Sequence, residues 1–357
     1  MTKATECLAL NPKPQYKKEN NETKDKKKMI IVTGGAGFIG SLMVEALERI
    51  GRYDTVVCDV LGQDSKWKNI AKRELGTIIH PDEIFGFLSQ NAARVQAIIH
   101  MGAISSTTES NADLIISSNF KLSQGLWSWC SIHKKRFIYA SSAATYGNGE
   151  HGFVDGFTPK ELSIYRPLNP YGWSKHLFDR WVARLNTTNV EKPSQCVGLK
   201  FFNVYGPNEY HKGEQRSIIH KMAGQILEGR EVTLFKSCHP SYPDGGQMRD
   251  FVYVKDCVDV MLWFLANPNE SGLFNVGTGD PATFNEVAYG VFEALGYNDP
   301  RITYIDMPPE VQRHYQNYTQ ASLSNLRKAG YKKPFTPIKE GILDYVRNYF
   351  LKEDPYV

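Results

Sequence analysis

The chain has 357 residues, a length that suits one large α/β unit or two modules built around a sizeable core. Its formal net charge of +4 lies in the first 28 residues, where eight lysines face four acidic residues, so the remainder is balanced. A balanced body gives little reason to expect nucleic-acid binding. No stretch approaches the roughly 18 uninterrupted apolar residues of a membrane span.

The first 28 residues are polar and rich in lysine, with few large apolar side chains. That composition predicts a disordered basic extension and leaves open a contact arm, an upstream start or an added segment. It has no apolar stretch of the kind that a secretory signal requires. Six cysteines without a C-x-x-C pair are typical of a reduced cytoplasmic protein. The single pair Cys238-His239 is too small a set for a metal site, so none is expected.

The first predicted strand and helix enclose a glycine-rich turn. The apolar run 29–32 precedes Thr-Gly-Gly-Ala-Gly-Phe-Ile-Gly at 33–40, and the amphipathic stretch 41–50 follows it. The three spaced glycines of this turn are Gly34, Gly37 and Gly40. They let the chain turn sharply and approach a pyrophosphate, and Asp59 supplies an acid about 20 residues further on. The pattern predicts a dinucleotide site rather than an ordinary strand-to-helix turn.

Apolar runs and helical patterns alternate along much of the rest of the chain. Strands are predicted at 55–60, 95–100, 137–140, 196–202 and 274–276, and long helices at 114–132 and 171–185. The strand runs are nearly continuous in Val, Ile and Phe, which is typical of a parallel sheet covered on both faces. We therefore predict an α/β protein: a Rossmann-type doubly wound parallel sheet with a smaller mixed α/β substrate-binding cap.

The composition of the chain changes after Asn203, where Gly, Pro, His and aromatic residues become frequent. We expect 29–202 and 250–280 to form the dinucleotide-binding domain, with 203–249 and 281–357 as the substrate-binding domain. The run 249–254 is expected to return to the central sheet. Ligands of open α/β sheets lie at the carboxyl ends of the strands, so the site is expected between sheet and cap.

A candidate catalytic set lies on one predicted helix and the strand before it. Tyr171 and Lys175 are one turn apart, on the same helix face. The segment 139–147 ends a strand in small hydroxyl residues, namely Ser141, Ser142 and Thr145. Such hydroxyls often satisfy local turns, but their position at the carboxyl edge of the sheet favours a catalytic role.

The glycine turn, the Ser/Thr strand end and the Tyr-x-x-x-Lys helix together resemble the extended short-chain dehydrogenase/reductase family, over residues 29 to about 350. Within that family the chain is similar to nucleotide-sugar enzymes. The resemblance implies that Tyr171, as phenolate, removes a hydroxyl proton while hydride leaves the same carbon for the nicotinamide. Lys175 then lowers the phenol pKa and holds the nicotinamide ribose, and Ser142 hydrogen-bonds the reacting oxygen.

Three finer motifs, at 105–109, 203–213 and 249–254, resemble the ADP-heptose 6-epimerase branch of this family. The resemblance implies inversion at C6″ of ADP-heptose through a transient ketone, for the inner core of lipopolysaccharide. It also implies that Lys212 is a second acid/base residue, because hydride must leave one face of the carbon and return to the other. A loop lysine is otherwise a solvated surface residue, and His211 is the next candidate.

The same resemblance implies a set of contacts to each ligand. The cofactor residues are Gly34, Gly37, Phe38, Ile39, Gly40, Asp59, Lys66, Gly102, Ala103, Ser105, Asn119, Tyr171, Lys175 and Val204. The substrate residues are Ser105, Ser142, Asn203, Lys221, Arg249 and Tyr315. The guanidinium of Arg249 suits a diphosphate, since it forms paired hydrogen bonds. The chain departs from the family pattern at 214–217, Glu-Gln-Arg-Ser, and has Lys221 where a histidine is expected.

The cofactor and the reaction both have alternatives. The carboxylate of Asp59 favours an unphosphorylated ribose, but Lys66 can offset its charge, and the resemblance implies NADP first and NAD second. A 4-epimerase or a 4,6-dehydratase is the alternative enzyme, although 143–146 lack the carboxylate pair of a dehydratase. A non-catalytic dinucleotide sensor would not need the tyrosine and lysine. The resemblance further implies a homo-oligomer, with no nucleic-acid or membrane partner.

Overall fold

The computed structural model describes residues 28–312 and 315–357. The basic extension expected at 1–28 therefore lies outside the described residues, apart from Lys28. Within the described ranges, no helix combines the length and the apolar character needed to cross a membrane.

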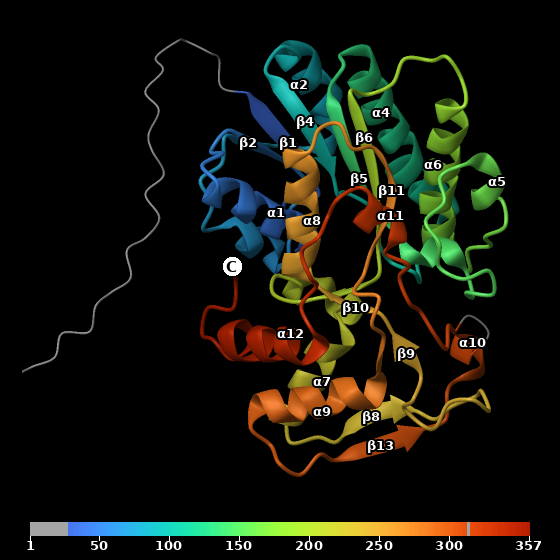
Figure 1. The fold of residues 1–357 in the computed structure, drawn as a ribbon. Helices are drawn as coiled ribbons and strands as arrows, with labels where there is room; N and C mark the ends of the chain where they lie inside the picture. Colours follow the sequence, from blue (N-terminus) through green and yellow to red (C-terminus); the bar gives the residue numbers. More distant parts are fainter. Residues whose placement is uncertain (1–27, 313–314) are drawn as a thin grey trace, which may run out of the picture.

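A seven-stranded parallel sheet occupies the upper half of the molecule in Figure 1. Its order is β11-β6-β5-β4-β1-β2-β3. The strands are β1 (Met29–Thr33), β2 (Thr55–Cys58), β3 (Thr77–Ile79), β4 (Val95–His100), β5 (Arg136–Ser142), β6 (Gln195–Phe201) and β11 (Gly272–Val276). The strand order reverses between β1 and β4, which places a crevice at their carboxyl ends. The predicted doubly wound sheet is confirmed.

Helices cover both faces of this sheet, as Figure 1 shows. They are α1 (Phe38–Arg49), α2 (Ile84–Asn91), α3 (Ala112–Ile115), α4 (Leu122–Ile132), α6 (Pro170–Asn186) and α8 (Val254–Ala266). Successive residues of β1 belong to opposite cores: Ile30 and Val32 pack with α1 and α8, whereas Met29 and Ile31 pack with α2 and α4. Because both faces are buried, the strand reads as a continuous apolar run.

The long helix predicted at 114–132 is interrupted by a wider, π-helical turn, η3 (Ile116–Lys121), between α3 and α4. Asn119 lies in this turn and is buried. Its side chain accepts from the amide of Ile104 at 2.8 Å and donates to that residue's carbonyl at 3.0 Å. The turn thus anchors the loop that follows β4.

A smaller α/β layer lies below the sheet in Figure 1. Its helices are α7 (Ile218–Leu227), α9 (Phe284–Leu295) and α12 (Ile338–Tyr345), and β13 (Ile302–Ile305) pairs in parallel with β8 (Val232–Phe235). The remaining elements are short: α5 (Pro159–Leu162), α10 (Pro309–Gln312), α11 (Ser324–Lys328), η1 (Ser65–Ile70), η2 (Pro81–Glu83), η4 (Ala143–Tyr146), η5 (Tyr210–Gln215) and η6 (Val346–Phe350). The mixed α/β cap is confirmed, whereas the exact domain boundaries stay a prediction.

The expectation that 249–254 returns to the central sheet is wrong. Its two short strands pair elsewhere: β9 (Met248–Arg249) with β12 (Ala282–Thr283), and β10 (Phe251–Tyr253) with β7 (Asn203–Tyr205). The chain has already left the sheet at β7, and β10 follows it. The sheet position beside β6 is occupied by β11 instead.

Candidate active site

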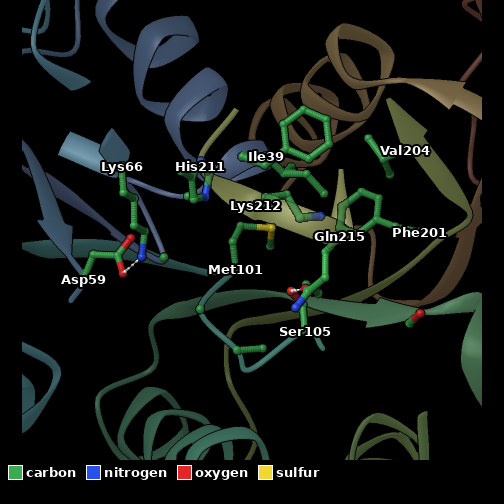
Figure 2. Close-up of a pocket in the computed structure, with 18 of the residues that line it drawn as sticks. Ile39, Asp59, Lys66, Met101, Ser105, Phe201, Val204, His211, Lys212 and Gln215 are labelled. Carbon is green, nitrogen blue, oxygen red and sulfur yellow. Dashed lines mark hydrogen bonds and ion pairs between the residues drawn. The ribbon is translucent and has the colours of Figure 1, made fainter. Parts of the chain in front are cut away.

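A cavity of about 560 Å³ opens at the carboxyl ends of β1, β2, β4 and β5, and η5 closes its other side. It brings together most of the predicted site residues. Those that line it are Gly34, Gly37, Phe38, Ile39, Gly40, Asp59, Lys66, Gly102, Ala103, Ser105, Ser142, Tyr171, Lys175, Val204 and Lys212. Figure 2 shows several of these side chains around the cavity.

The glycine turn after β1 is packed so tightly that side chains are excluded. Gly34 has φ +65°, and a Cβ there would lie 2.6 Å from the amide nitrogen of Gly102. A Cβ on Gly40 would lie 2.1 Å from the carbonyl oxygen of Gly34. The backbone is therefore free to approach a ligand, and the amides at the start of α1 suit a pyrophosphate. This cradle fits a dinucleotide.

Asp59 is fixed at the edge of the same cavity by three hydrogen bonds. Its Oδ2 accepts from the amide of Ala36 at 2.9 Å, and its Oδ1 accepts from the amide of Val60 at 2.8 Å. Lys66 Nζ donates to Oδ1 at 2.7 Å, the contact that is dashed in Figure 2. The carboxylate and the ammonium thus neutralise each other at the place where a ribose hydroxyl is expected.

The pair Tyr171 and Lys175 lies on the first turns of α6, which starts at Pro170 and is capped by Asn169, whose side chain accepts from the amide of Gly172 at 2.8 Å. Lys175 Nζ donates to the carbonyl of Ala140 at 2.8 Å, and burial lowers the pKa of this lysine to about 8.

Burial raises the pKa of the Tyr171 phenol, and a hydrogen bond with Ser142 opposes that rise. A hydroxyl donor beside a phenol favours the phenolate, the form that a general base requires. Tyr171, Lys175 and Ser142 thus have the arrangement expected for proton transfer.

Lys212 enters the cavity from a different element, η5. Its ammonium lies 5.3 Å from the centre of the Phe38 ring, and burial lowers its pKa while Glu209 opposes that effect. The neighbouring His211 also lines the cavity, and burial lowers its pKa to about 4. Two ionisable groups, Tyr171 and Lys212, therefore reach one cavity from two elements.

Several predicted substrate residues do not line this cavity. Arg249 and Tyr315 lie together elsewhere, with the guanidinium carbon 4.9 Å from the ring centre. Lys221 Nζ lies 3.3 Å from the carboxylate of the exposed Glu214. Asn203 pairs in β7 with β10 and is exposed. Asn119, a predicted cofactor residue, does not line the cavity either, and its side chain donates to Ser174 Oγ at 3.1 Å. Arg249 and Tyr315 thus form a second polar group, which lies apart from the cavity that contains Tyr171 and Lys212.

Two features of the site were not predicted. Ser105 Oγ donates to Gln215 Oε1 at 3.3 Å, which links the loop after β4 to η5 (Figure 2). Gln215 lies in the stretch 214–217, whose departure from the family pattern was the only signal. Behind the cavity, Lys200 and Asp179 form a fully buried ion pair at 2.8 Å. Residues so distant in sequence carry no local pattern.

Comparison with known proteins agrees with this geometry. A model of the NAD dependent epimerase/dehydratase family matches residues 30–277. The chain is 47% identical over 331 residues to the ADP-L-glycero-D-manno-heptose-6-epimerase of Nitratidesulfovibrio vulgaris, covering 92% of this chain and all of that one.

Solved structures of nucleotide-sugar epimerases are also similar to this chain. That of Helicobacter pylori ADP-L-glycero-D-manno-heptose-6-epimerase has a TM-score of 0.72 at 28% identity, covering 92% of this chain and 98% of that one. The Thermus thermophilus UDP-glucose 4-epimerase complex with NAD has a TM-score of 0.68 at 26% identity, covering 89% and 97%. The chain therefore belongs to the NAD dependent epimerase/dehydratase family.

Proposed function

We propose that the protein converts ADP-D-glycero-D-manno-heptose to ADP-L-glycero-D-manno-heptose by inversion at C6″ through a transient ketone. The observation that carries the proposal is the meeting of Tyr171 and Lys212, from α6 and η5, in one cavity with the glycine turn. The relatives bearing that activity in their names support it. The product would supply the heptose of the lipopolysaccharide inner core.

The chemistry divides between the cofactor and the chain. The glycine turn and Asp59 would hold a nicotinamide dinucleotide, which would supply a reversible hydride acceptor for C6″. Tyr171 takes or gives the hydroxyl proton on one face, and Lys212 does so on the other, so each base serves one epimer. Lys175 supports the Tyr171 phenolate with its positive charge, and Ser142 holds the reacting oxygen.

Replacing each base separately tests this division. Tyr171→Phe and Lys212→Met remove one proton-transfer group each and keep the approximate shape, so both should fold and bind cofactor. Each should lower the epimerisation rate about 10²–10⁴-fold, measured as the ratio of the two ADP-heptose epimers over time. With an analogue that carries an aldehyde at C6″, one molecule can be oxidised while another is reduced, without inversion. Each variant should retain this oxidation and reduction for the one stereochemistry that its remaining base serves.

The reaction also predicts a spectroscopic result for the wild-type protein. No net reduced nicotinamide should accumulate at 340 nm during turnover, because an epimerase regenerates its oxidant in every cycle. Stoichiometric accumulation would instead indicate a simple dehydrogenase.

The replacement of Lys212 has its own contrary outcome. If Lys212→Met epimerises at the wild-type rate, Lys212 is an ordinary loop lysine, and His211 becomes the candidate for the second base.

We also propose NADP as the preferred cofactor, with NAD as the alternative. Lys66 supports this preference, since its ammonium lies 2.7 Å from Asp59, the residue predicted to meet the ribose, and could turn from it to a 2′-phosphate. Lys66→Met should therefore weaken NADP binding at least tenfold and NAD binding much less, measured by calorimetry. Tighter binding of NAD than of NADP to the wild-type protein would contradict the preference.

The family resemblance further supports a homo-oligomer, which sedimentation velocity checks. The scattered cysteines support a location in the cytoplasm. Neither point affects the chemistry proposed for the cavity. The alternative activities, a 4-epimerase, a 4,6-dehydratase or a non-catalytic sensor, have no observation in their favour.

A further inference from the structure

Glu209 holds both ends of the loop that carries Lys212. Its backbone carbonyl accepts from the amide of Lys212 at 3.0 Å. Its carboxylate accepts from the amide of Ser217 and, at 2.7 Å, from the Ser217 hydroxyl. Ser217 in turn caps α7, since its hydroxyl accepts from the amide of His220 at 3.2 Å. One residue thus ties the loop 210–216 to the start of α7, through its backbone at one end and its side chain at the other.

The carboxylate of Glu209 is fully buried. A buried carboxylate is costly unless donors and a positive charge hold it. Besides Ser217, the amide of Gly206 donates to Oε1 at 3.4 Å. Burial raises the pKa of Glu209, whereas these donors and the charge of Lys212 lower it and so favour the anion.

Lys212 lies on the loop that Glu209 fixes, and the two charges act on each other although their side chains form no direct ion pair in the described residues. Burial lowers its pKa and the charge of Glu209 raises it. A lysine that gives and takes a proton near neutral pH needs such a balance, because full burial would leave it neutral and a close ion pair would keep it charged.

Other titratable groups face this loop from neighbouring elements. Tyr345 of α12 and the adjacent Tyr210 lie against Glu209 itself, and burial and the charge of Glu209 raise the pKa of both phenols. Asp59, Asp64 and Lys66 act on the adjacent His211 from the β2 and η1 side. Tyr171 and Lys175 line the same cavity from α6. Within the described residues, the charge that opposes the effect of burial on Lys212 comes from Glu209.

We propose that Glu209 is the positioning residue of Lys212: it fixes the backbone of the loop and provides the buried negative charge against which the ammonium is held. The catalytic meaning rests on the function proposed above. The charge coupling between the two side chains does not, because it is measured without turnover.

Glu209→Gln tests the coupling, since it preserves the shape and an acceptor for Ser217 while it removes the charge. Glu214→Gln is the matched control: it removes a carboxylate of the same loop whose side chain is 94% exposed and therefore screened. The readout is competitive labelling with acetic anhydride from about pH 6 to 11, with Lys212 followed by peptide mass spectrometry.

The midpoint of Lys212 labelling should fall by about one pH unit or more in Glu209→Gln, because the ammonium loses its counter-charge. It should stay at the wild-type value in Glu214→Gln. An unchanged midpoint in Glu209→Gln, or an equal shift in both variants, overturns the proposal. A shifted midpoint together with no epimerisation of ADP-heptose by the wild-type protein rejects the function but not the coupling.

A reciprocal measurement covers the case in which Glu209→Gln does not fold. Coupling acts in both directions, so Lys212→Met must raise the pKa of Glu209 further. A carboxyl whose pKa is raised on folding costs the protein stability as pH rises from its ordinary value of 4.5 through the folded value. In urea unfolding this loss should extend to higher pH in Lys212→Met than in Lys221→Met, whose lysine is paired with Glu214. Coincident curves overturn the coupling.

Discussion

At the carboxyl edge of the sheet, the protonation state of a side chain is set by its burial and by one or two hydrogen-bonding or charged neighbours. His100, at the end of β4, shows this for a residue outside the proposed chemistry. Its Nδ1 lies 2.6 Å from Thr33 Oγ1 and its Nε2 lies 2.8 Å from Ser123 Oγ. Ser123 already donates to the carbonyl of Asn119, so the histidine donates from Nε2 and accepts at Nδ1. This neutral form agrees with a pKa lowered to about 3 by burial and by the charge of Lys175.

His100 should therefore contribute to acid denaturation. Between about pH 3 and 6.5 the native state leaves it unprotonated while the unfolded chain protonates it, so stability falls as pH falls through that range. One proton corresponds to a slope of about 1.36 kcal/mol per pH unit. His100→Gln should reduce the slope of the unfolding free energy by up to that amount, measured by urea unfolding at several pH values.

The exposed His151 provides the control for this measurement. His151→Gln should leave the slope unchanged. A slope in His100→Gln equal to that of the wild-type protein would mean that the native state binds a proton at His100, and the tautomer argument would be wrong.

At the scale of elements, α6 and β6 are joined beneath the active site by the buried pair Asp179 and Lys200. Asp179 also accepts from Tyr139 and Ser141 of β5, at 3.0 and 2.7 Å. Lys200 donates to Thr145 of η4 at 2.6 Å. Removing one member leaves an uncompensated charge in the interior, whereas removing both leaves none.

A double-mutant cycle should reveal this asymmetry. Lys200→Met alone should destabilise the protein by about 3–5 kcal/mol, because Asp179 is left buried without its partner. Adding Asp179→Asn should recover a large part of that loss, since the amide can still accept from Ser141. Urea unfolding of the four proteins measures the coupling energy. Additive effects would show that hydrogen bonds, and not the charge pair, hold these elements together.

At the scale of the whole molecule, six of the seven strands of the central sheet were predictable from sequence, because each is buried on both faces and reads as a continuous apolar run. The seventh, β3, was not predicted, since this three-residue strand is only partly buried. The glycine turn and the Tyr171 helix were predictable because their chemistry has a fixed local spacing. The pairing of β10 with β7 was not, since a three-residue strand carries no signal for its partner. Neither was the ion pair of Asp179 with Lys200, which depends on how α6 packs on β6.

Long-range contacts also join the end of the described chain to the active-site loop. Val357 N donates to Asn208 Oδ1 at 3.0 Å, and the Tyr210 hydroxyl donates to the carbonyl of Pro355 at 3.0 Å. Lys72 donates to the carbonyl of Tyr356 at 2.6 Å. Asn208 and Tyr210 lead directly into Lys212, so this segment braces the loop from outside the cavity.

Deletion of the C-terminal segment should therefore impair the protein, whereas deletion of the basic extension should not. Removing residues 354–357 should lower the melting temperature by several degrees and reduce kcat for ADP-heptose more than cofactor affinity, because the loop that carries Lys212 loses its brace. Removing residues 1–28 should change neither, since their composition offers few apolar groups to dock on the body. Scanning calorimetry and the epimer ratio measure both effects. Full activity and an unchanged melting temperature without 354–357 would mean that Glu209 and Ser217 alone suffice to hold the loop.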